Sequence, residues 1–291
     1  MNPYSVAPAK EKSVTTTTPV PQKSGLVLFW AVTFTTTFAF WLVAIALGGS
    51  AMSSPTVILY LLGGFGPVFG AIAVRVRRAR RSQPAPTHTV RLRLTARLLW
   101  VLPLLVLASA TVLAAALLAE LLGGPAISFT AGQSLIATAG GPVPFFVSML
   151  VAGPLAEEPG WRGTAYPRLR ASMSSLQAGL LLGVIWAVWH LPLFFISGTV
   201  QAAFGLVSWS GLLFTLSVIP MALLTCYAYE RAGVAASIAV HLGVNATMAL
   251  LSVNSPITQA SILVVQFLVA ITLLARQRER QAARPVDMAH G

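Results

Sequence analysis

Long uncharged segments constrain this chain more than any other feature of its sequence. No residue between Lys23 and Arg75 is charged, and over the whole chain only 9% of residues are charged whereas 56% are hydrophobic. Soluble globular proteins carry about 25% charged residues. A chain so poor in charge lacks the polar surface of a soluble domain, so the sequence predicts an integral membrane protein.

The apolar segments have the length of membrane-spanning helices. One span needs about 20 apolar residues, and eight segments approach that length between stretches rich in Gly, Pro, Ser or charge. They are Gly25–Leu47, Thr56–Val74, Leu98–Leu122, Val143–Trp161, Ala178–Ile196, Trp209–Tyr229, Val234–Leu251 and Ile257–Leu274. The predicted fold is an all-α, polytopic transmembrane helix bundle of about eight spans over residues 25–275. Residues 1–24 are predicted to be a disordered tail and residues 276–291 a polar tail.

Basic residues are confined to alternate loops. If the N-terminus is cytoplasmic, all 19 Lys and Arg residues fall on the cytoplasmic side. The four segments on the opposite side carry no charge: Gly48–Pro55, Gly123–Pro142, Ser197–Ser208 and Ser252–Pro256. This distribution follows the positive-inside bias. It predicts that both termini are cytoplasmic.

The net charge of +12 raises the question of a nucleic-acid partner. The densest basic cluster, RVRRARR at Arg75–Arg81, directly follows an apolar segment. A basic cluster in that position anchors topology or contacts anionic lipid more often than it binds nucleic acid. We therefore predict the lipid bilayer as a partner and no nucleic acid. The single cysteine, Cys226, excludes an internal disulfide framework and a cysteine-rich metal site.

A few ionisable residues lie in or beside the predicted spans. A charge at mid-bilayer costs about 2.5–3.5 kcal/mol on the insertion scale, so such residues normally face a cavity, pair with one another and serve a function. These residues are Glu120, Glu157, Glu158, Arg162, His190 and His241. Glu120 lies near the end of its span, where its side chain can reach the interface. We expect no functional role for Glu120.

The adjacent carboxylates Glu157 and Glu158 are predicted to have different roles. On a helix their side chains point about 100° apart. Arg162 follows Glu158 by four residues and can neutralise it, whereas Glu157 has no such cation. Pro159 disturbs a helix, so the pairing requires that the helix resume promptly. We predict a supporting Glu158–Arg162 pair and a general base at Glu157.

Two histidines lie on later spans, each with a second side chain one helical turn away. His190 follows Trp186 by four residues, and Asn245 follows His241 by four. The imidazole and amide of the second pair could donate to one oxygen, as in an oxyanion hole. Either pair alone could equally serve packing or interhelical hydrogen bonding. Together with Glu157 they supply a base, its partner and two donors, which predicts hydrolysis of a peptide bond by activated water.

The three motifs resemble the signatures of a known family. The segment EEPGWRG is similar to EExxxR, WAVWH to [F/W]xxxH, and HLGVN to HxxxN, and they occur in this order over Val143–Leu251. The chain thereby resembles the CPBP group, also called Abi or CAAX-protease-like intramembrane endopeptidases. In that family the first glutamate and first histidine activate water, and the last histidine and asparagine form the oxyanion hole. The resemblance implies catalytic Glu157, His190, His241 and Asn245, supported by Glu158, Arg162 and Trp186.

Two alternatives accompany this prediction. Glu157, His190 and His241 could hold zinc, although the sequence has no HExxH helix and we predict no metal cofactor. The polar cluster could also belong to a non-hydrolytic protein, such as a bacteriocin-immunity factor.

The predicted substrate is a membrane-associated peptide or protein. The family resemblance implies either a prenylated CAAX tail or a signal-like or bacteriocin-like peptide. Arginines outnumber lysines sixteen to three, which indicates a GC-rich bacterium, and bacteria generally lack protein prenylation. We therefore favour the second kind of substrate and a bacterial inner or plasma membrane.

Overall fold

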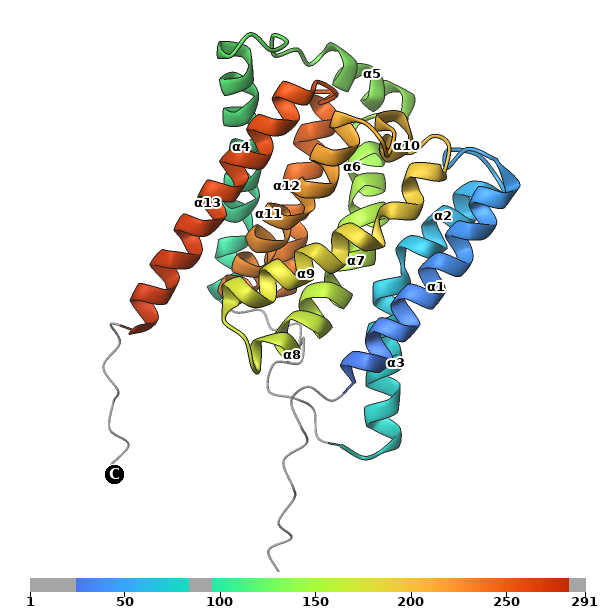
Figure 1. Cartoon of the computed structure of the whole chain (residues 1–291), viewed down its shortest axis with the longest axis vertical. Helices are drawn as coiled ribbons and strands as arrows, with labels where there is room; N and C mark the ends of the chain where they lie inside the picture. Colours follow the sequence, from blue (N-terminus) through green and yellow to red (C-terminus); the bar gives the residue numbers. More distant parts are fainter. Residues whose placement is uncertain (1–24, 84–95, 283–291) are drawn as a thin grey trace, which may run out of the picture.

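The structure is a computed structural model that describes residues 25–83 and 96–282. These residues form helices joined by turns and loops, and none of them lies in a β-strand (Figure 1). The all-α prediction is therefore confirmed. The predicted tail of residues 1–24 lies outside the described residues, as do residues 283–291. Residues 276–282, assigned to a tail by sequence, continue the last helix.

Five helical segments are long and apolar enough to cross a membrane alone. They contain α1 (Leu26–Leu47), α4 (Val101–Leu121), α9 (Ser175–Trp189), α11 (Trp209–Ala232) and α13 (Pro256–Ala282). Two bent pairs raise the number of candidate spans to seven. The first joins α2 (Thr56–Gly64) to α3 (Gly66–Arg80) at 49°, and the second joins α5 (Thr130–Thr138) to the stretch Pro142–Arg170 at 88°.

The remaining predicted span is a shorter helix. α12 (Val234–Leu250) is apolar but has only 17 residues, fewer than the roughly 20 of a full span. The polytopic helical bundle is confirmed, with five to seven candidate spans where the sequence predicted about eight. The short helix explains the difference, because each predicted segment has a helical counterpart.

The stretch Pro142–Arg170 is not one regular helix. It consists of α6 (Pro142–Leu150), α7 (Ala156–Gly160) and α8 (Tyr166–Arg170), separated by π-helical turns at Val151–Leu155 and Trp161–Ala165. Pro154 lies in the first π turn and Pro159 inside α7. Proline has no amide hydrogen and cannot continue the regular ladder, and π turns inside helices are frequent at functional sites. The predicted span Val143–Trp161 is therefore a broken helix.

Close backbone contacts place α7 and α12 inside the bundle. α7 packs against α3 and α12 against α4. Gly160 lies so close to Pro67 that a side chain at position 160 would overlap the Pro67 backbone. α11 ends at Ala232 and α12 begins at Val234, and the single residue between them, Gly233, has a φ of 76° in the left-handed region. Glycine adopts this conformation without a steric penalty, so the chain reverses within one residue.

Glu230 joins several segments at one end of the bundle. Its carboxylate accepts hydrogen bonds from Tyr166 Oη at 2.7 Å, Arg170 Nε at 2.8 Å and Ser175 Oγ at 2.9 Å. The side chain of Gln277 also donates to it. Because these partners come from α8, α9 and α13, Glu230 of α11 fixes the relative positions of four helices.

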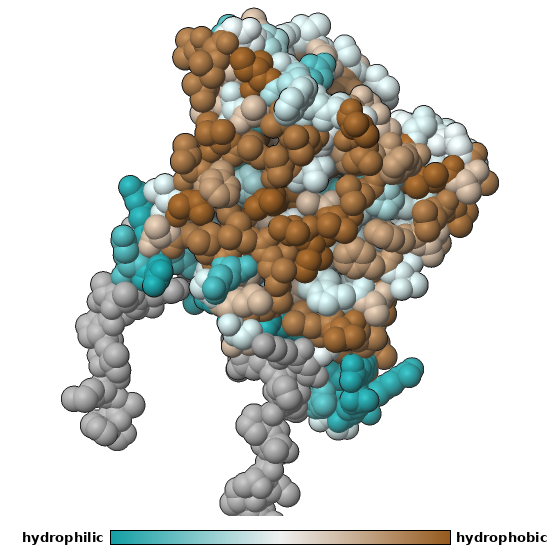
Figure 2. All heavy atoms as spheres, in the orientation of Figure 1, coloured by the Kyte–Doolittle hydropathy of each residue, from teal (hydrophilic) through white to brown (hydrophobic). Residues whose placement is uncertain are grey.

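The two ends of the bundle differ in charge. α3 and α13 end on the same side (Figure 1), and strongly hydrophilic residues gather there below a broad hydrophobic surface (Figure 2). Two of the segments predicted to lie together on the uncharged side are in contact, since the amide of Ala51 donates to the carbonyl of Ser197 at 2.7 Å. The chain is a multi-pass membrane protein. Its orientation relative to the cytoplasm stays a prediction.

Candidate active site

The predicted site residues come together from three parts of the bundle. Glu157 lies on α7, His190 directly follows α9, and His241 lies on α12. At 1.5 Å per residue, His190 lies about 22 Å from the start of α9 and His241 about 10 Å from the start of α12. Their rings nevertheless flank Trp186, with centroid distances of 5.6 and 5.2 Å. Figure 1 shows α9 crossing the bundle obliquely, which compensates for the difference in helix position.

Trp186 fixes the two groups that were predicted to activate water. Its indole Nε1 donates to Glu157 Oε2 at 2.6 Å. Its backbone carbonyl accepts a hydrogen bond from His190 Nδ1 at 2.8 Å. Glu157 and Trp186 are both buried. The two groups are therefore linked through one residue of α9, with the second oxygen of Glu157 left for another partner.

The hydrogen bond of His190 determines which of its nitrogens can take part in chemistry. A carbonyl oxygen can only accept, so His190 Nδ1 must carry the hydrogen. In the neutral ring, Nε2 then has a free lone pair and can accept a hydrogen bond from water. Trp189 and Phe214 contact the ring edge to face, at centroid distances of 4.9 and 5.7 Å. These aromatic contacts hold the imidazole in one orientation.

Next to Glu157, the buried side chain of Glu158 contacts both Arg162 and His241. Arg162 Nη1 donates to Glu158 Oε1 at 3.2 Å, and His241 Nδ1 lies 2.8 Å from the same oxygen. The side chains of Glu158 and Arg162 are fully buried. The predicted pairing at four-residue spacing is therefore present, because the helical turn resumes after Pro159. The guanidinium also lies 4.3 Å from the Trp186 ring centroid, a cation–π contact.

Side-chain atoms of three predicted site residues on α7 and α12 lie close to one position beside Gly153. A Cβ atom built on Gly153 would lie 3.6 Å from Asn245 Nδ2, 3.7 Å from His241 Nε2 and 3.9 Å from Glu157 Oε1. Glycine keeps this position free of side-chain atoms. A carboxylate, an imidazole and an amide thus converge within contact distance of one point, as a hydrolytic site requires.

Gly153 was not identified from the sequence. It precedes Glu157 by four residues, so the two positions share a helix face. That spacing was the available signal, although the intervening Pro154 obscured it. The double role of Trp186, through its indole and its backbone carbonyl, had no sequence signal beyond its distance from His190.

Glu120 lies apart from the site. Its Oε2 accepts a hydrogen bond from the amide of Ile127 at 3.2 Å in an exposed part of the chain. The carboxylate thus contacts the loop that follows α4, at the end of its span as predicted.

The side chains proposed as zinc ligands do not form a metal-binding group. Within residues 25–83 and 96–282, no three His, Cys, Asp or Glu side chains are placed to hold a metal ion. Glu157 Oε2 is bound by the Trp186 indole, and His241 Nδ1 by Glu158. The absence of a metal cofactor stays a prediction, and the proposed mechanism contains no step through a metal.

Comparison with known proteins covers this same region. Residues 139–247 match a family model described as Type II CAAX prenyl endopeptidase Rce1-like. A curated relative, CAAX prenyl protease 2 of Methanococcus maripaludis, is 28% identical over 256 residues, which cover 85% of this chain and 92% of that protein. Over this region the chain is similar to CAAX-protease-like proteins. The resemblance seen in the motifs is thereby confirmed, and the chain is a membrane peptidase in general terms.

Proposed function

We propose that the chain is an intramembrane endopeptidase in which Glu157 and His190 activate the attacking water, while His241 and Asn245 stabilise the oxyanion. The observation that carries this proposal is the convergence of Glu157, His241 and Asn245 on the position beside Gly153. The similarity to CAAX-protease-like proteins favours hydrolysis over the binding-only alternative.

In the first step, the water gives its proton to Glu157 as its oxygen attacks the peptide carbonyl carbon. The indole of Trp186 holds Glu157 Oε2, so Oε1 is the oxygen that takes the proton. His190 Nε2 accepts the second hydrogen of the water and orients it, since His190 Nδ1 is engaged with the Trp186 carbonyl. General-base catalysis of this kind contributes about 10²- to 10⁴-fold.

In the same step, the carbonyl oxygen becomes an oxyanion beside α12. Asn245 Nδ2 donates one hydrogen bond to it. His241 can donate from Nε2 while Nδ1 donates to Glu158 only if the ring carries both protons, and the carboxylate of Glu158 supplies the opposite charge. Collapse of the tetrahedral intermediate breaks the C–N bond, and Glu157 returns its proton to the leaving amine. One such donor is worth about 10²- to 10³-fold in rate.

We propose a membrane-associated peptide or protein as the substrate and a bacterial plasma membrane as the site of action. Two probes distinguish the substrate classes: a membrane peptide with a prenylated CAAX-type tail, and a signal-like membrane peptide without a lipid. The arginine-rich composition favours cleavage of the second. Preferential cleavage of the prenylated probe would assign the first class.

Replacement of the proposed base tests the mechanism. We expect Glu157→Gln to lower kcat by about 10²- to 10⁴-fold, because the amide keeps the shape but cannot take a proton. The measurement is cleavage of both membrane peptides by the full-length protein in lipid vesicles. Glu120→Gln is the matched control, since it removes one carboxylate outside the site, and it should retain activity. Full activity of Glu157→Gln would overturn the proposal.

Metal removal tests the zinc alternative directly. We expect cleavage to be unchanged after treatment with a strong chelator, because the proposed mechanism uses protein groups and water. The measurement compares chelated, zinc-supplemented and untreated protein in the same peptide assay. Activity lost on chelation and restored by zinc would establish a metallopeptidase instead.

A further inference from the structure

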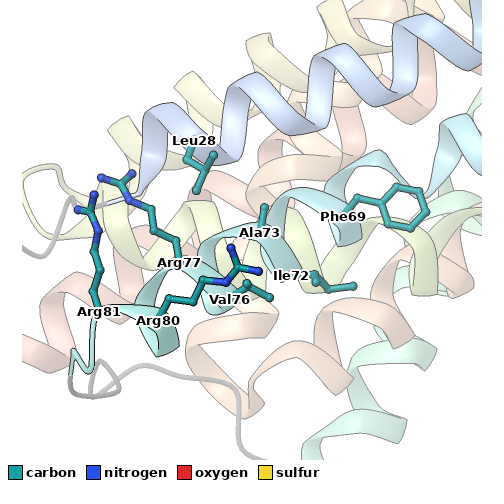
Figure 3. Close-up of a pocket in the computed structure, with 8 residues that line it drawn as sticks. All are labelled: Leu28, Phe69, Ile72, Ala73, Val76, Arg77, Arg80 and Arg81. Carbon is teal, nitrogen blue, oxygen red and sulfur yellow. The ribbon is translucent and has the colours of Figure 1, made fainter.

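A groove between α1 and α3 lies outside the proposed catalytic site. It has a volume of about 530 Å³, and its lining is apolar at one end and cationic at the other (Figure 3). Its apolar wall consists of Leu28, Phe69, Ile72, Ala73 and Val76. Both Ile72 and Val76 are more than two-fifths exposed. An exposed apolar wall on a membrane-spanning segment faces hydrocarbon, so this part of the groove is suited to an acyl chain.

Three arginines close one end of the same groove. Arg77, Arg80 and Arg81 line it together with the apolar wall. Positions 69, 73, 76 and 80 recur at three- and four-residue spacing, so one face of α3 changes from apolar to cationic. Phe69 and Arg80 are separated by about 16 Å along the helix axis at 1.5 Å per residue. Figure 3 shows Phe69 at the opposite end of the groove from the arginines.

Among residues 25–83 and 96–282, no carboxylate forms an ion pair with the arginines of this groove. In the described part of the chain, the ion pairs involve Glu158 and Glu230, and none includes Arg77, Arg80 or Arg81. These three residues are exposed at the end of α3. An anionic ligand therefore meets unpaired guanidinium groups, which bind phosphate oxygens in bidentate geometry.

We propose that this groove binds an anionic phospholipid of the adjoining leaflet. The headgroup phosphate contacts Arg77, Arg80 and Arg81, and one acyl chain lies along the wall from Val76 to Phe69. Nucleic acid would match the arginines but not the apolar wall, and a soluble acidic protein would leave that wall in contact with hydrocarbon. An amphiphile with an anionic head matches both parts of the groove.

Lipid retention by the full-length protein tests this proposal. The protein is reconstituted in phosphatidylcholine with a minor fraction of phosphatidylglycerol, extracted into detergent, and analysed by native mass spectrometry for bound lipid. We expect preferential retention of phosphatidylglycerol. Each arginine near an anionic membrane surface contributes about fivefold to binding, so the triple variant Arg77→Gln/Arg80→Gln/Arg81→Gln should lose most of it.

Matched variants distinguish lipid binding in the groove from non-specific attraction between basic residues and anionic lipid. Arg97→Gln/Arg276→Gln/Arg278→Gln removes the same charge from exposed arginines outside the groove and should retain the lipid. Ala73→Phe fills the groove without changing charge and should reduce retention. Thermal unfolding of each variant monitors folding. Equal loss in both triple variants, unchanged retention in Ala73→Phe, or displacement of the lipid by an acidic peptide would each overturn the proposal.

Discussion

At the scale of single residues, the geometry of the site depends on a glycine, Gly153, and on a tryptophan, Trp186, that forms two hydrogen bonds. Gly153 keeps free the position on which the atoms of Glu157, His241 and Asn245 converge. Trp186 holds Glu157 through its indole and His190 through its carbonyl. A substitution at Gly153 or Trp186 is therefore expected to change the geometry of the predicted catalytic side chains, although neither residue itself takes part in the proposed proton transfer.

Gly153→Ala tests whether this position must remain empty. The added methyl group would meet its neighbours at ordinary contact distances of 3.6 to 3.9 Å, so we expect folding to be retained. It would displace the scissile carbonyl, and a 1 Å displacement of reacting groups costs about 10²-fold in rate. The measurements are kcat in the peptide assay and the thermal unfolding temperature.

Gly64→Ala is the matched control for this change. Its nearest new contact is the Ala152 carbonyl oxygen at 4.0 Å, and the added methyl group meets none of the three side chains beside Gly153, so activity should be unaffected. If Gly153→Ala cleaved at the rate of the unmodified protein, the substrate would have to bind elsewhere.

The sequence predicted some of these contacts and could not predict others. Arg162 pairs with Glu158 as the four-residue spacing indicated, because that contact is local to one helical turn. The contact of Glu158 with His241 joins residues 83 positions apart, and only tertiary packing determines it. The direct contact of the Trp186 indole with Glu157 likewise joins two helices and had no sequence signal, and a water shared by Glu157 and His190 stays a prediction.

At the scale of secondary-structure elements, the broken helical stretch from α6 to α8 carries the buried residues Glu157, Glu158 and Arg162. Between its two π turns, α7 carries Glu157 at the site and Glu158 in contact with Arg162. Sequence patterns predicted a helix here, and they predicted the disturbance at Pro159. They did not predict the π turns or the bend of 88° after α5, because both depend on packing against neighbouring helices.

Arg162→Met tests the energetic role of the buried pair. Removing Arg162 leaves the buried Glu158 carboxylate with only its contact to His241, and breaking a buried pair costs about 3–5 kcal/mol in the free energy of unfolding. The measurement is denaturant-induced unfolding of the protein in mixed micelles. Arg276→Met, an exposed change on α13, should stay within about 0.5 kcal/mol.

A second variant separates charge from packing at this pair. Glu158→Gln/Arg162→Met removes both charges, so its stability should exceed that of Arg162→Met alone. A double variant less stable than Arg162→Met would show that the side-chain packing, rather than the unpaired charge, accounts for the loss.

At the scale of the whole molecule, charge is segregated to one end of a helical bundle. The sequence predicted this segregation because basic residues in loops follow a strong positional bias. It overestimated the number of full spans because hydropathy alone does not distinguish a short helix such as α12 from a complete one. The oblique course of α9 (Figure 1) accompanies the contact of both histidine rings with Trp186.

Cysteine labelling tests the predicted orientation. The native Cys226 is buried, so the unmodified protein provides a low baseline. Ser53→Cys lies on the uncharged side and Ser172→Cys on the basic side, and both positions are exposed. We expect a membrane-impermeant maleimide added to intact cells to label Ser53→Cys, and Ser172→Cys to react only after permeabilisation. The opposite pattern would place the termini outside the cytoplasm.

The one-turn spacing of Glu158 and Arg162 also bears on how the protein is made. As the ribosome extends the nascent chain, this pair can form at once, so the helix enters the bilayer with its charges already matched. His241 follows 83 residues later, about 4–17 s at 5–20 residues per second. Throughout that interval the growing polypeptide contains Glu157 but not yet His241 and Asn245, the proposed hydrogen-bond donors to the oxyanion. We therefore expect the protease to stay inert until its synthesis is nearly complete, which protects the insertion machinery beside it.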